Sequence, residues 1–190
     1  MLDSSSQRPS SALPPVTLVL GGARSGKSRY AEAAIERASG GGTYIATATI
    51  EDDEMRARVA EHCARRSAQW RTIEESLDLV GAIATAARWQ RPILVDCLTL
   101  WLANLMRAGG DLGAETERFI AGLTAATEPI VLVANEVGLG IVPENALARA
   151  FRDAAGRLNQ RVAALADRVV FMAAGLPMLL KDAALTEPHP

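Results

Sequence analysis

Short runs of apolar residues recur along the chain between longer segments of helical periodicity. The runs are continuous and rich in β-branched residues, a pattern typical of strands that are buried on both faces. They span residues 16–20 (VTLVL), 43–48 (TYIATA), 93–97 (ILVDC), 130–134 (IVLVA) and 168–174 (RVVFMAA). Helix-like segments lie between them, at 28–39, 51–66, 75–89, 113–127 and 144–166.

This alternation of strand and helix predicts an α/β fold with a mostly parallel sheet and helices on both faces. The segment RVVFMAAGLPMLLK predicts a closing antiparallel hairpin around Gly175 and Pro177. No repeat or linker interrupts the pattern, so residues 15–183 are expected to form a single domain. Residues 1–14 are rich in serine and proline and are expected to be disordered, and residues 184–190 to form a flexible tail. The apolar stretch CLTLWLANLM fits an interface or the core equally well.

Composition narrows the function classes. The chain has 190 residues and a formal net charge of −2, which argues against a nucleic-acid-binding face. Its two cysteines, Cys63 and Cys97, provide neither a disulfide framework nor a zinc site, and a reducing, cytoplasmic setting is expected. No apolar run approaches the roughly 18 residues of a membrane span, and the beginning of the chain has no signal-peptide core.

The segment LVLGGARSGKSRYAEAAI matches the phosphate-loop pattern G-x-x-x-x-G-K-[ST]. A strand before the loop and a helix after it argue against the plainer alternative, a glycine-rich turn with an incidental lysine. The glycines let backbone N–H groups turn toward phosphate oxygens, and the helix N-terminus adds partial positive charge. Lys27 is expected to reach the β- and γ-phosphates, and Ser28 to hold Mg²⁺. The candidate nucleotide-binding residues of the loop are Gly21, Gly22, Ala23, Arg24, Ser25, Gly26, Lys27 and Ser28.

Asp96 stands at the carboxyl end of the run ILVDC, where parallel sheets place their ligands. A carboxylate there can support the Mg²⁺ shell. The alternative is an acidic residue that only caps the next helix. No N-K-x-D box for guanine is present, and the chain reads ANEVGLG after the fourth strand, so a GTPase switch is disfavoured.

His62 lies in a predicted helix among arginines. Arg58 precedes it by four residues, and Arg65 and Arg66 follow by three and four, so the four side chains would share a helix face. Neighbouring positive charge favours the neutral imidazole, which is a nucleophile, and guanidinium groups hold phosphates. The spacing therefore suggests a histidine that attacks a nucleotide phosphorus. The spacing alone leaves open a plain surface histidine.

Four segments together carry a resemblance to a known family: GGARSGKS, YIATATIEDDEMRARVAEHCARRSAQWRTIEE, ILVDCLTLWLANL and the long stretch that begins VLVANEVGLGIVPEN. From about residue 16 to 181, the chain resembles the bifunctional adenosylcobinamide kinase / adenosylcobinamide-phosphate guanylyltransferase of cobalamin biosynthesis. The resemblance implies a P-loop NTPase-like fold and two reactions. A nucleoside triphosphate, ATP or GTP, phosphorylates adenosylcobinamide. GTP then gives GMP to the new phosphate through a GMP–histidine intermediate at the position of His62, releasing pyrophosphate.

The resemblance also implies further contacts and partners. Besides the phosphate loop, the nucleotide contacts carried over are Ala46, Thr47, Ala48, Cys63, Ala64, Arg65, Arg66, Glu74 and Asp96. Cys63 and Ala64 lack ligating side chains, so their contact would run through the backbone. The implied cofactors are GTP, ATP and Mg²⁺. The implied partners are adenosylcobinamide and its phosphate, with assembly as a homo-oligomer, a trimer in the family.

Two other functions remain open at this point: a phosphate-loop kinase of another small molecule, and a GTP-sensing module without catalysis. Only the guanylyltransferase needs His62 as a covalent nucleophile, so this residue separates the first alternative from the resemblance. The motif NEVGLGIVPEN also has two interpretations. Asn135 and Glu136 could orient Mg²⁺-bound water or a substrate hydroxyl, or the segment is a structured loop in which Gly138 and Gly140 make turns and Pro143 starts a helix.

Overall fold

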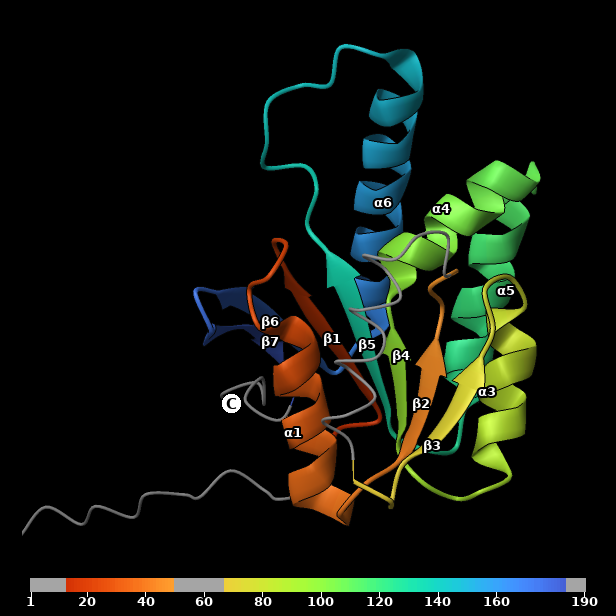
Figure 1. Cartoon of the computed structure of the whole chain (residues 1–190), viewed down its shortest axis with the longest axis vertical. Coiled ribbons are helices and arrows are strands. Elements are labelled where there is room, and N and C mark those ends of the chain that lie inside the picture. The colour runs from red at the N-terminus through yellow and green to blue at the C-terminus, as the bar shows by residue number, and fades with distance from the viewer. Residues whose placement is uncertain (1–12, 50–66, 184–190) are drawn as a thin grey trace, which may run out of the picture.

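A computed structural model, which describes residues 13–49 and 67–183, shows one seven-stranded sheet with helices on both of its faces (Figure 1). The strand order is β3-β2-β4-β5-β1-β6-β7, and every neighbouring pair is parallel except β6 and β7. The strands are β1 (Val16–Gly21), β2 (Thr43–Ala46), β3 (Arg71–Glu74), β4 (Ile93–Asp96), β5 (Ile130–Asn135), β6 (Arg168–Ala173) and β7 (Leu176–Asp182). The expected parallel sheet and C-terminal hairpin are both confirmed.

Helices are found at four of the predicted segments, 28–39, 75–89, 113–127 and 144–166, and the predicted helix at 51–66 lies outside the described residues. The described helices are α1 (Lys27–Ser39), α3 (Leu79–Ala87), α4 (Leu98–Ala108), α5 (Leu112–Ala125) and α6 (Ala146–Leu165). Three of them begin at side-chain caps, because Asp78, Asp111 and Asn145 accept hydrogen bonds from the first free backbone N–H groups. No helix of the described ranges is long and apolar enough to cross a membrane.

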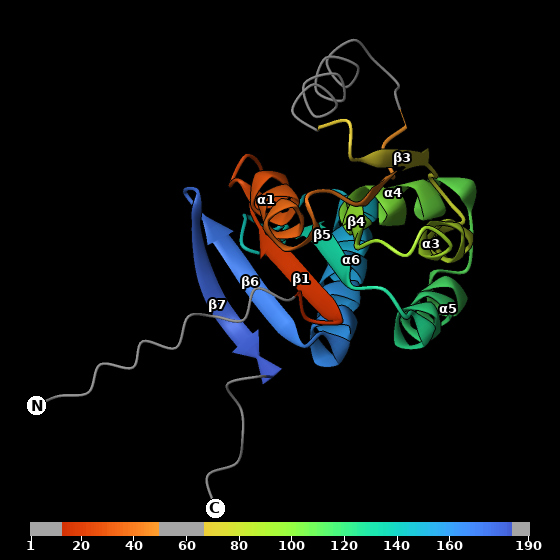
Figure 2. The same ribbon diagram turned by 90° about the horizontal axis from the view of Figure 1, so that it is seen from below.

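Two hydrophobic clusters lie on opposite faces of the sheet (Figure 2). On one face α1 packs Ala31 and Ile35 against the sheet, and Leu13, which belongs to the expected N-terminal extension, packs against this cluster. On the other face α3, α4, α5 and α6 cover the strands. Trp101 of α4 and Phe119 of α5 meet there with ring centroids 5.0 Å apart.

The structure departs from the expected elements at three places. Strand β3 was not expected, because its four residues RTIE are mostly exposed and carry no apolar run. Helix α4 occupies the stretch that we could assign only to an interface or the core, and it is core: Trp101, Leu102 and Leu105 are buried. Helix α3 begins at Leu79 rather than near residue 75, because the Glu75 carboxylate accepts hydrogen bonds from the backbone N–H groups of Leu77 and Asp78.

The β6–β7 hairpin closes through a two-residue turn. Ala174 and Gly175 both have positive φ angles, 50° and 80°, and Ala173 pairs with Leu176 across the turn. Positive φ at both central residues is the geometry that two-residue hairpins favour. Pro177 lies in β7, at the edge of the sheet, where a missing N–H costs no ladder bond.

Candidate nucleotide site

The phosphate loop connects the end of β1 to the start of α1 at the carboxyl edge of the sheet. Gly21 and Gly26 have φ angles of 149° and 95°, and Arg24 has one of 54°. A Cβ atom at Gly21 would collide with the Met172 carbonyl oxygen, whereas one at Gly22 would meet open space. The two outer glycines are therefore required by the turn itself, and the loop surrounds an open cradle at the N-terminus of α1.

Lys27 and Ser25 are the buried polar side chains of the loop. The Lys27 ammonium donates a hydrogen bond to the Gly22 carbonyl oxygen at 2.6 Å, and its residue is 7 % exposed. Burial lowers the pKa of Lys27, and the negative charge of Asp96 opposes that shift. The Ser25 hydroxyl oxygen is buried and has no hydrogen-bond partner in the described chain. A buried hydroxyl without a partner, next to a buried cation, suits a bound anion such as a phosphate group.

Two backbone hydrogen bonds fix the loop to its neighbours. The Gly175 N–H, in the β6–β7 turn, donates to the Ser25 carbonyl oxygen at 3.0 Å. The Glu136 N–H, just after β5, donates to the Gly21 carbonyl oxygen at 3.0 Å. The loop is thus held from the strands on both sides of β1.

Asp96 ends β4, and β5 separates β4 from β1 in the sheet. The Tyr44 hydroxyl donates a hydrogen bond to the Asp96 carboxylate at 3.0 Å. Asp96 also acts electrostatically on Lys27. The structure therefore brings the predicted carboxylate to the same edge of the sheet as the phosphate loop.

The predicted contacts Ala46, Thr47 and Ala48 lie beside Asp96. Ala46 pairs in register with Asp96 on one side and with Glu74 on the other, so these three positions form a row across the sheet edge. Thr47 is fully buried, and its hydroxyl both donates to the Cys97 carbonyl oxygen and accepts from the Cys97 N–H, each at 2.8 Å. Burial raises the pKa of the Cys97 thiol to about 11, so this thiol is protonated at neutral pH and has a structural role.

Asn104 of α4 holds the segment that follows β2 through side-chain hydrogen bonds. Its amide donates hydrogen bonds to the carbonyl oxygens of Thr47, at 2.8 Å, and Ser76, at 3.2 Å, and its oxygen accepts from the Thr49 hydroxyl at 3.3 Å. Asn104 is 8 % exposed. Asn104 thereby links the chain just after β2 to the chain just after β3. These two segments directly follow Ala46 and Glu74, the last residues of the two strands.

Replacing Asn104 by alanine should lower the free energy of unfolding by about 1–3 kcal/mol, because the buried Thr47 carbonyl loses its donor. It should also raise the KM for the nucleotide, since the Ala46–Ala48 segment loses its support. Chemical denaturation and steady-state kinetics measure the two effects. Thr49→Val is the matched control: Thr49 is exposed and its hydrogen bond is long, so its cost should stay under about 0.5 kcal/mol. Equal costs for both variants would contradict the assigned role of Asn104.

The donor set fits the Mg²⁺ that the motif implies. Ser28, the second residue of α1, and Asp96 offer oxygen atoms, which are the ligands that Mg²⁺ takes in nucleotide sites together with phosphates and water. In the parts of the chain that the structure describes, no group of three or more histidine, cysteine or acidic side chains could hold a metal ion. The residues present are therefore suited to a metal shared with the nucleotide rather than to a metal cage built by protein alone.

The predicted nucleophile and its neighbours lie outside the described residues. These are His62, Cys63, Ala64, Arg65 and Arg66. Their assignment stays a prediction. The structure describes the chain up to residue 49, just after β2, and again from residue 67, just before β3.

Asn135 and Glu136 make contacts that shape the loop after β5. The Asn135 N–H donates to the Thr99 hydroxyl at 2.7 Å, and the Asn159 amide donates to the Asn135 carbonyl oxygen at 3.2 Å. The Glu136 carboxylate accepts from the Gly138 N–H at 2.6 Å. These contacts support the structured-loop interpretation. The helix that follows begins at Ala146 with Asn145 as its cap, three residues later than an origin at Pro143.

Three supporting residues were missed in the sequence: Tyr44, Thr99 and Asn104. Each is a polar side chain inside an apolar segment, and all three are buried. A buried polar group needs a partner, so such interruptions are a usable signal for side chains that hold a site. Their partners here, Asp96, Asn135 and Thr47, all lie at the carboxyl edge of the sheet.

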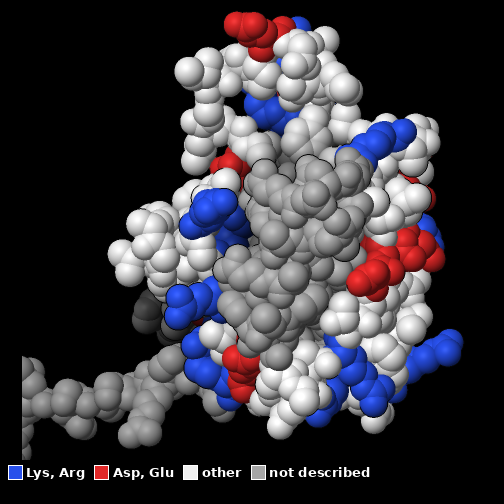
Figure 3. All heavy atoms as spheres, in the orientation of Figure 1, with Lys and Arg blue, Asp and Glu red and all other residues white. Residues whose placement is uncertain are grey.

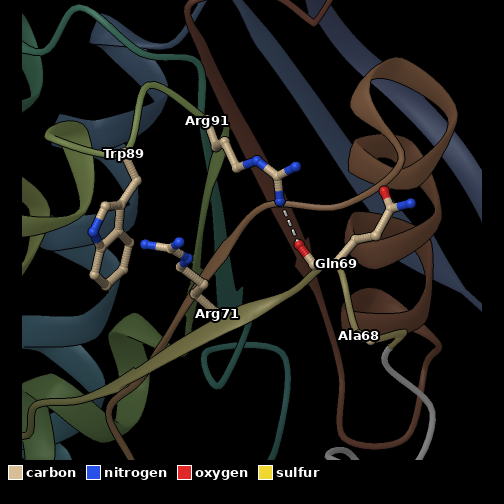
Figure 4. A pocket seen from close by; sticks show the side chains of 5 residues that line it. All are labelled: Ala68, Gln69, Arg71, Trp89 and Arg91. Carbon is tan, nitrogen blue, oxygen red and sulfur yellow. Dashed lines mark hydrogen bonds between the residues drawn. The ribbon is translucent and has the colours of Figure 1, made fainter.

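A hollow of about 440 Å³ lies at the amino ends of the strands, opposite to the phosphate loop, where β3 begins (Figure 4). It is lined by Ala68, Gln69, Arg71, Trp89 and Arg91. The Arg71 guanidinium stands over the Trp89 ring, 4.9 Å from its centroid, and Arg91 donates to the Gln69 carbonyl oxygen at 2.6 Å. Both cations thus serve local packing, and no predicted site residue lines the hollow.

Comparison with known proteins gives consistent matches. The family model described as cobinamide kinase / cobinamide phosphate guanyltransferase matches residues 17–180. The bifunctional adenosylcobalamin biosynthesis protein CobP of Pseudomonas aeruginosa is 48 % identical over 170 residues, which cover 88 % of this chain and 98 % of the relative. The corresponding CobU proteins of Salmonella typhimurium and Escherichia coli are 45 % and 42 % identical over 179 residues, covering 86 % of this chain and 98 % of each relative.

Solved structures match more distantly. The flagellar accessory protein FlaH of Methanocaldococcus jannaschii has a TM-score of 0.52 and 14 % identity, covering 93 % of this chain and 83 % of that one. An ATPase of the type III secretion system of pathogenic bacteria also has a TM-score of 0.52 and 14 % identity, covering 86 % and 56 %. At such low identity these likenesses concern the fold alone, and they agree with a P-loop NTPase-like architecture.

Proposed function

The chain belongs to the cobinamide kinase / cobinamide phosphate guanyltransferase family, bifunctional transferases of cobalamin biosynthesis, and from this we propose the reactions it performs. A nucleoside triphosphate, ATP or GTP, phosphorylates the free hydroxyl of adenosylcobinamide. GTP then donates GMP to that phosphate through a GMP–His62 intermediate. The products are adenosylcobinamide-GDP and pyrophosphate.

In the kinase step the hydroxyl oxygen of the substrate attacks the γ-phosphorus of the nucleotide. The bond between the γ-phosphorus and the oxygen that bridges it to the β-phosphate breaks, and the nucleoside diphosphate leaves. The hydroxyl proton is lost to solvent. The phosphate loop from Gly21 to Ser28 holds the triphosphate by its backbone N–H groups, and the buried Lys27 ammonium stabilises negative charge on the transferring group. A Mg²⁺ ion held by Ser28 and Asp96 would neutralise further charge on the phosphate oxygens.

In the guanylyl step a neutral His62 nitrogen attacks the α-phosphorus of GTP, and pyrophosphate leaves. A phosphate oxygen of adenosylcobinamide phosphate then attacks the same phosphorus and releases the histidine. Arg65 and Arg66, three and four residues further along, would hold the phosphate. Covalent transfer divides one difficult displacement into two easier ones.

The observation that carries the proposal is the arrangement of Lys27, Asp96 and the Ala46–Glu74 row at one sheet edge, in a chain whose family match spans residues 17–180. These residues offer contacts for a triphosphate and a metal ion. A kinase of another small molecule would share this edge but would have no need of His62. The resemblance also supports a homo-oligomer, a trimer, and a cytoplasmic location, where the nucleotides are available.

Mass spectrometry of the products tests both reactions. The purified protein is incubated with adenosylcobinamide and Mg²⁺, in one arm with ATP and in the other with GTP. We expect cobinamide phosphate in the ATP arm and the GDP conjugate in the GTP arm. Phosphate without the GDP conjugate in either arm would leave a plain kinase, and no conversion despite nucleotide binding would leave a nucleotide-binding module.

A further inference from the structure

Exposed apolar side chains gather on the loop between β5 and α6. Leu139, Ile141 and Val142 are 81 %, 98 % and 62 % exposed, and Leu147, in the first turn of α6, is 72 % exposed. Figure 1 shows this loop, in cyan, rising beyond the carboxyl ends of the strands, and Figure 3 shows uncharged atoms along the outer flank of the projection, with charged side chains at its tip, in its middle and at its base. We call the four residues the apolar loop patch. Clustered apolar exposure of this kind marks a surface that contacts another molecule.

The patch is fixed relative to the nucleotide site. The loop leaves β5, the strand that lies between β1 with its phosphate loop and β4 with Asp96. Its first residue, Glu136, donates its N–H to Gly21 of the phosphate loop, and its carboxylate holds the Gly138 N–H. At the far end Arg149 donates to the carbonyl oxygens of Pro143 and Glu144. Both ends of the loop are therefore anchored, and its first residue is tied to the phosphate loop itself.

The acceptor substrate must lie on this side of the molecule. Its hydroxyl has to reach the γ-phosphate, so its remaining bulk extends outward from the carboxyl edge of the sheet. A corrinoid is a broad macrocycle with methyl groups on its rim, far larger than the hydroxyl-bearing arm that reacts. Within the described residues, the hollow of about 440 Å³ lies at the amino ends of the strands, away from the phosphate loop. The macrocycle would therefore have to bind an exposed surface near the carboxyl ends of the strands and not this hollow.

From this position and chemistry we propose that the apolar loop patch is the docking surface for the corrin ring of the acceptor, with Leu139 and Ile141 as its main contacts. The inference rests on the proposed function and assigns it a substrate-binding element. Apolar contact with the loop holds the macrocycle while its hydroxyl arm reaches toward the phosphate loop. Leu139 and Ile141 then contribute to binding of the acceptor and not to binding of the nucleotide.

The test uses Leu139→Ser and Ile141→Ser in the full chain. Each should raise the KM for adenosylcobinamide about tenfold, the loss expected when one apolar contact is removed, with kcat and the KM for the nucleotide little changed. The controls are Met178→Ser and Leu180→Ser on β7, which remove apolar side chains that are also exposed, 54 % and 59 %, from the sheet edge. The control variants should keep the wild-type KM for adenosylcobinamide.

Equilibrium dialysis of adenosylcobinamide with a non-hydrolysable nucleotide separates the inference from the proposed function. Weaker binding by the loop variants, with wild-type binding by the controls, supports the docking surface even in a protein that catalyses no transfer. Wild-type affinity in the loop variants overturns it, and so does an equal loss in the controls. Light scattering completes the test: a lower oligomeric mass of the loop variants would show that a second copy of the chain covers the patch, and would also overturn the inference.

Discussion

Replacing His62 by alanine should abolish the transfer of α-phosphate label from GTP to the chain, while the phosphorylation of adenosylcobinamide continues. The reason is chemical: the guanylyl step needs a nucleophile that leaves again, and alanine offers none. The kinase step uses the phosphate loop, whose described contacts run to Gly175 and Glu136. The variant should therefore accumulate cobinamide phosphate and form no GDP conjugate.

The measurement is retention of label on the denatured chain after incubation with α-labelled GTP. A phosphoramidate is stable to alkali and lost in acid, which distinguishes it from a phosphate ester on serine. The chain contains only one other histidine, and His189→Ala is the matched control, expected to label like the wild type. Label on the His62→Ala variant would mean that another group accepts GMP.

Replacing Lys27 by methionine should reduce both nucleotide reactions by a factor of about 10²–10³, the loss typical of removing one preorganised charge from a transition state. The Lys27 ammonium is held inside the loop by the Gly22 carbonyl oxygen, and methionine keeps the length of the side chain but removes its charge. Rates of cobinamide phosphorylation and of GMP labelling would both fall. A loss confined to one reaction would mean that the two steps use different triphosphate sites.

The same variant should fold as well as the wild type. Burial lowers the pKa of Lys27, so the folded state disfavours the charged form that the unfolded chain carries at neutral pH. This cost disappears in methionine, and the thermal midpoint should stay equal or rise. Lys181→Met, which changes the other lysine of the chain, is the control: it loses hydrogen bonds to the α6 carbonyl oxygens of Ala163 and Ala164 and should keep full activity. A lower midpoint for Lys27→Met would assign the lysine a structural role.

The fold was predictable where strands are buried and helices are amphipathic. The five apolar runs became β1, β2, β4, β5 and β6. Strand β3 was not predicted because an edge strand needs little apolar surface. Of its residues RTIE, only Ile73 is partly buried. Helix α4 was missed because the stretch LTLWLANLMRA was interpreted only as an apolar surface or core, with no element assigned to it. Its buried Leu98, Trp101, Leu102 and Leu105 nevertheless follow helical spacing, so a count of matches would have found it.

In the candidate site, residues with a fixed local spacing were predictable and residues brought together by packing were not. The phosphate loop and Asp96 were predictable because their chemistry demands fixed residue types at fixed spacing. The row of Glu74, Ala46 and Asp96 depends on strand order, which brings together positions far apart in the sequence. Tyr44, Thr99 and Asn104 were missed for the same reason, since their partners are set by packing and not by local spacing. His62 stays a prediction from the sequence.

The place of β1 in the sheet has a consequence for synthesis of the protein. Its hydrogen-bonded neighbours are β5 and β6, and Val16 pairs with Ile130 while Thr17 pairs with Arg168. During synthesis β1 therefore precedes both of its partners by more than a hundred residues, and neither flank is covered until β5 has been made. Such long sequence separations slow folding, because the intervening chain has to be closed into a loop first. Because the phosphate loop is held by the residue that follows β5, the nucleotide site cannot be completed before that strand has been made.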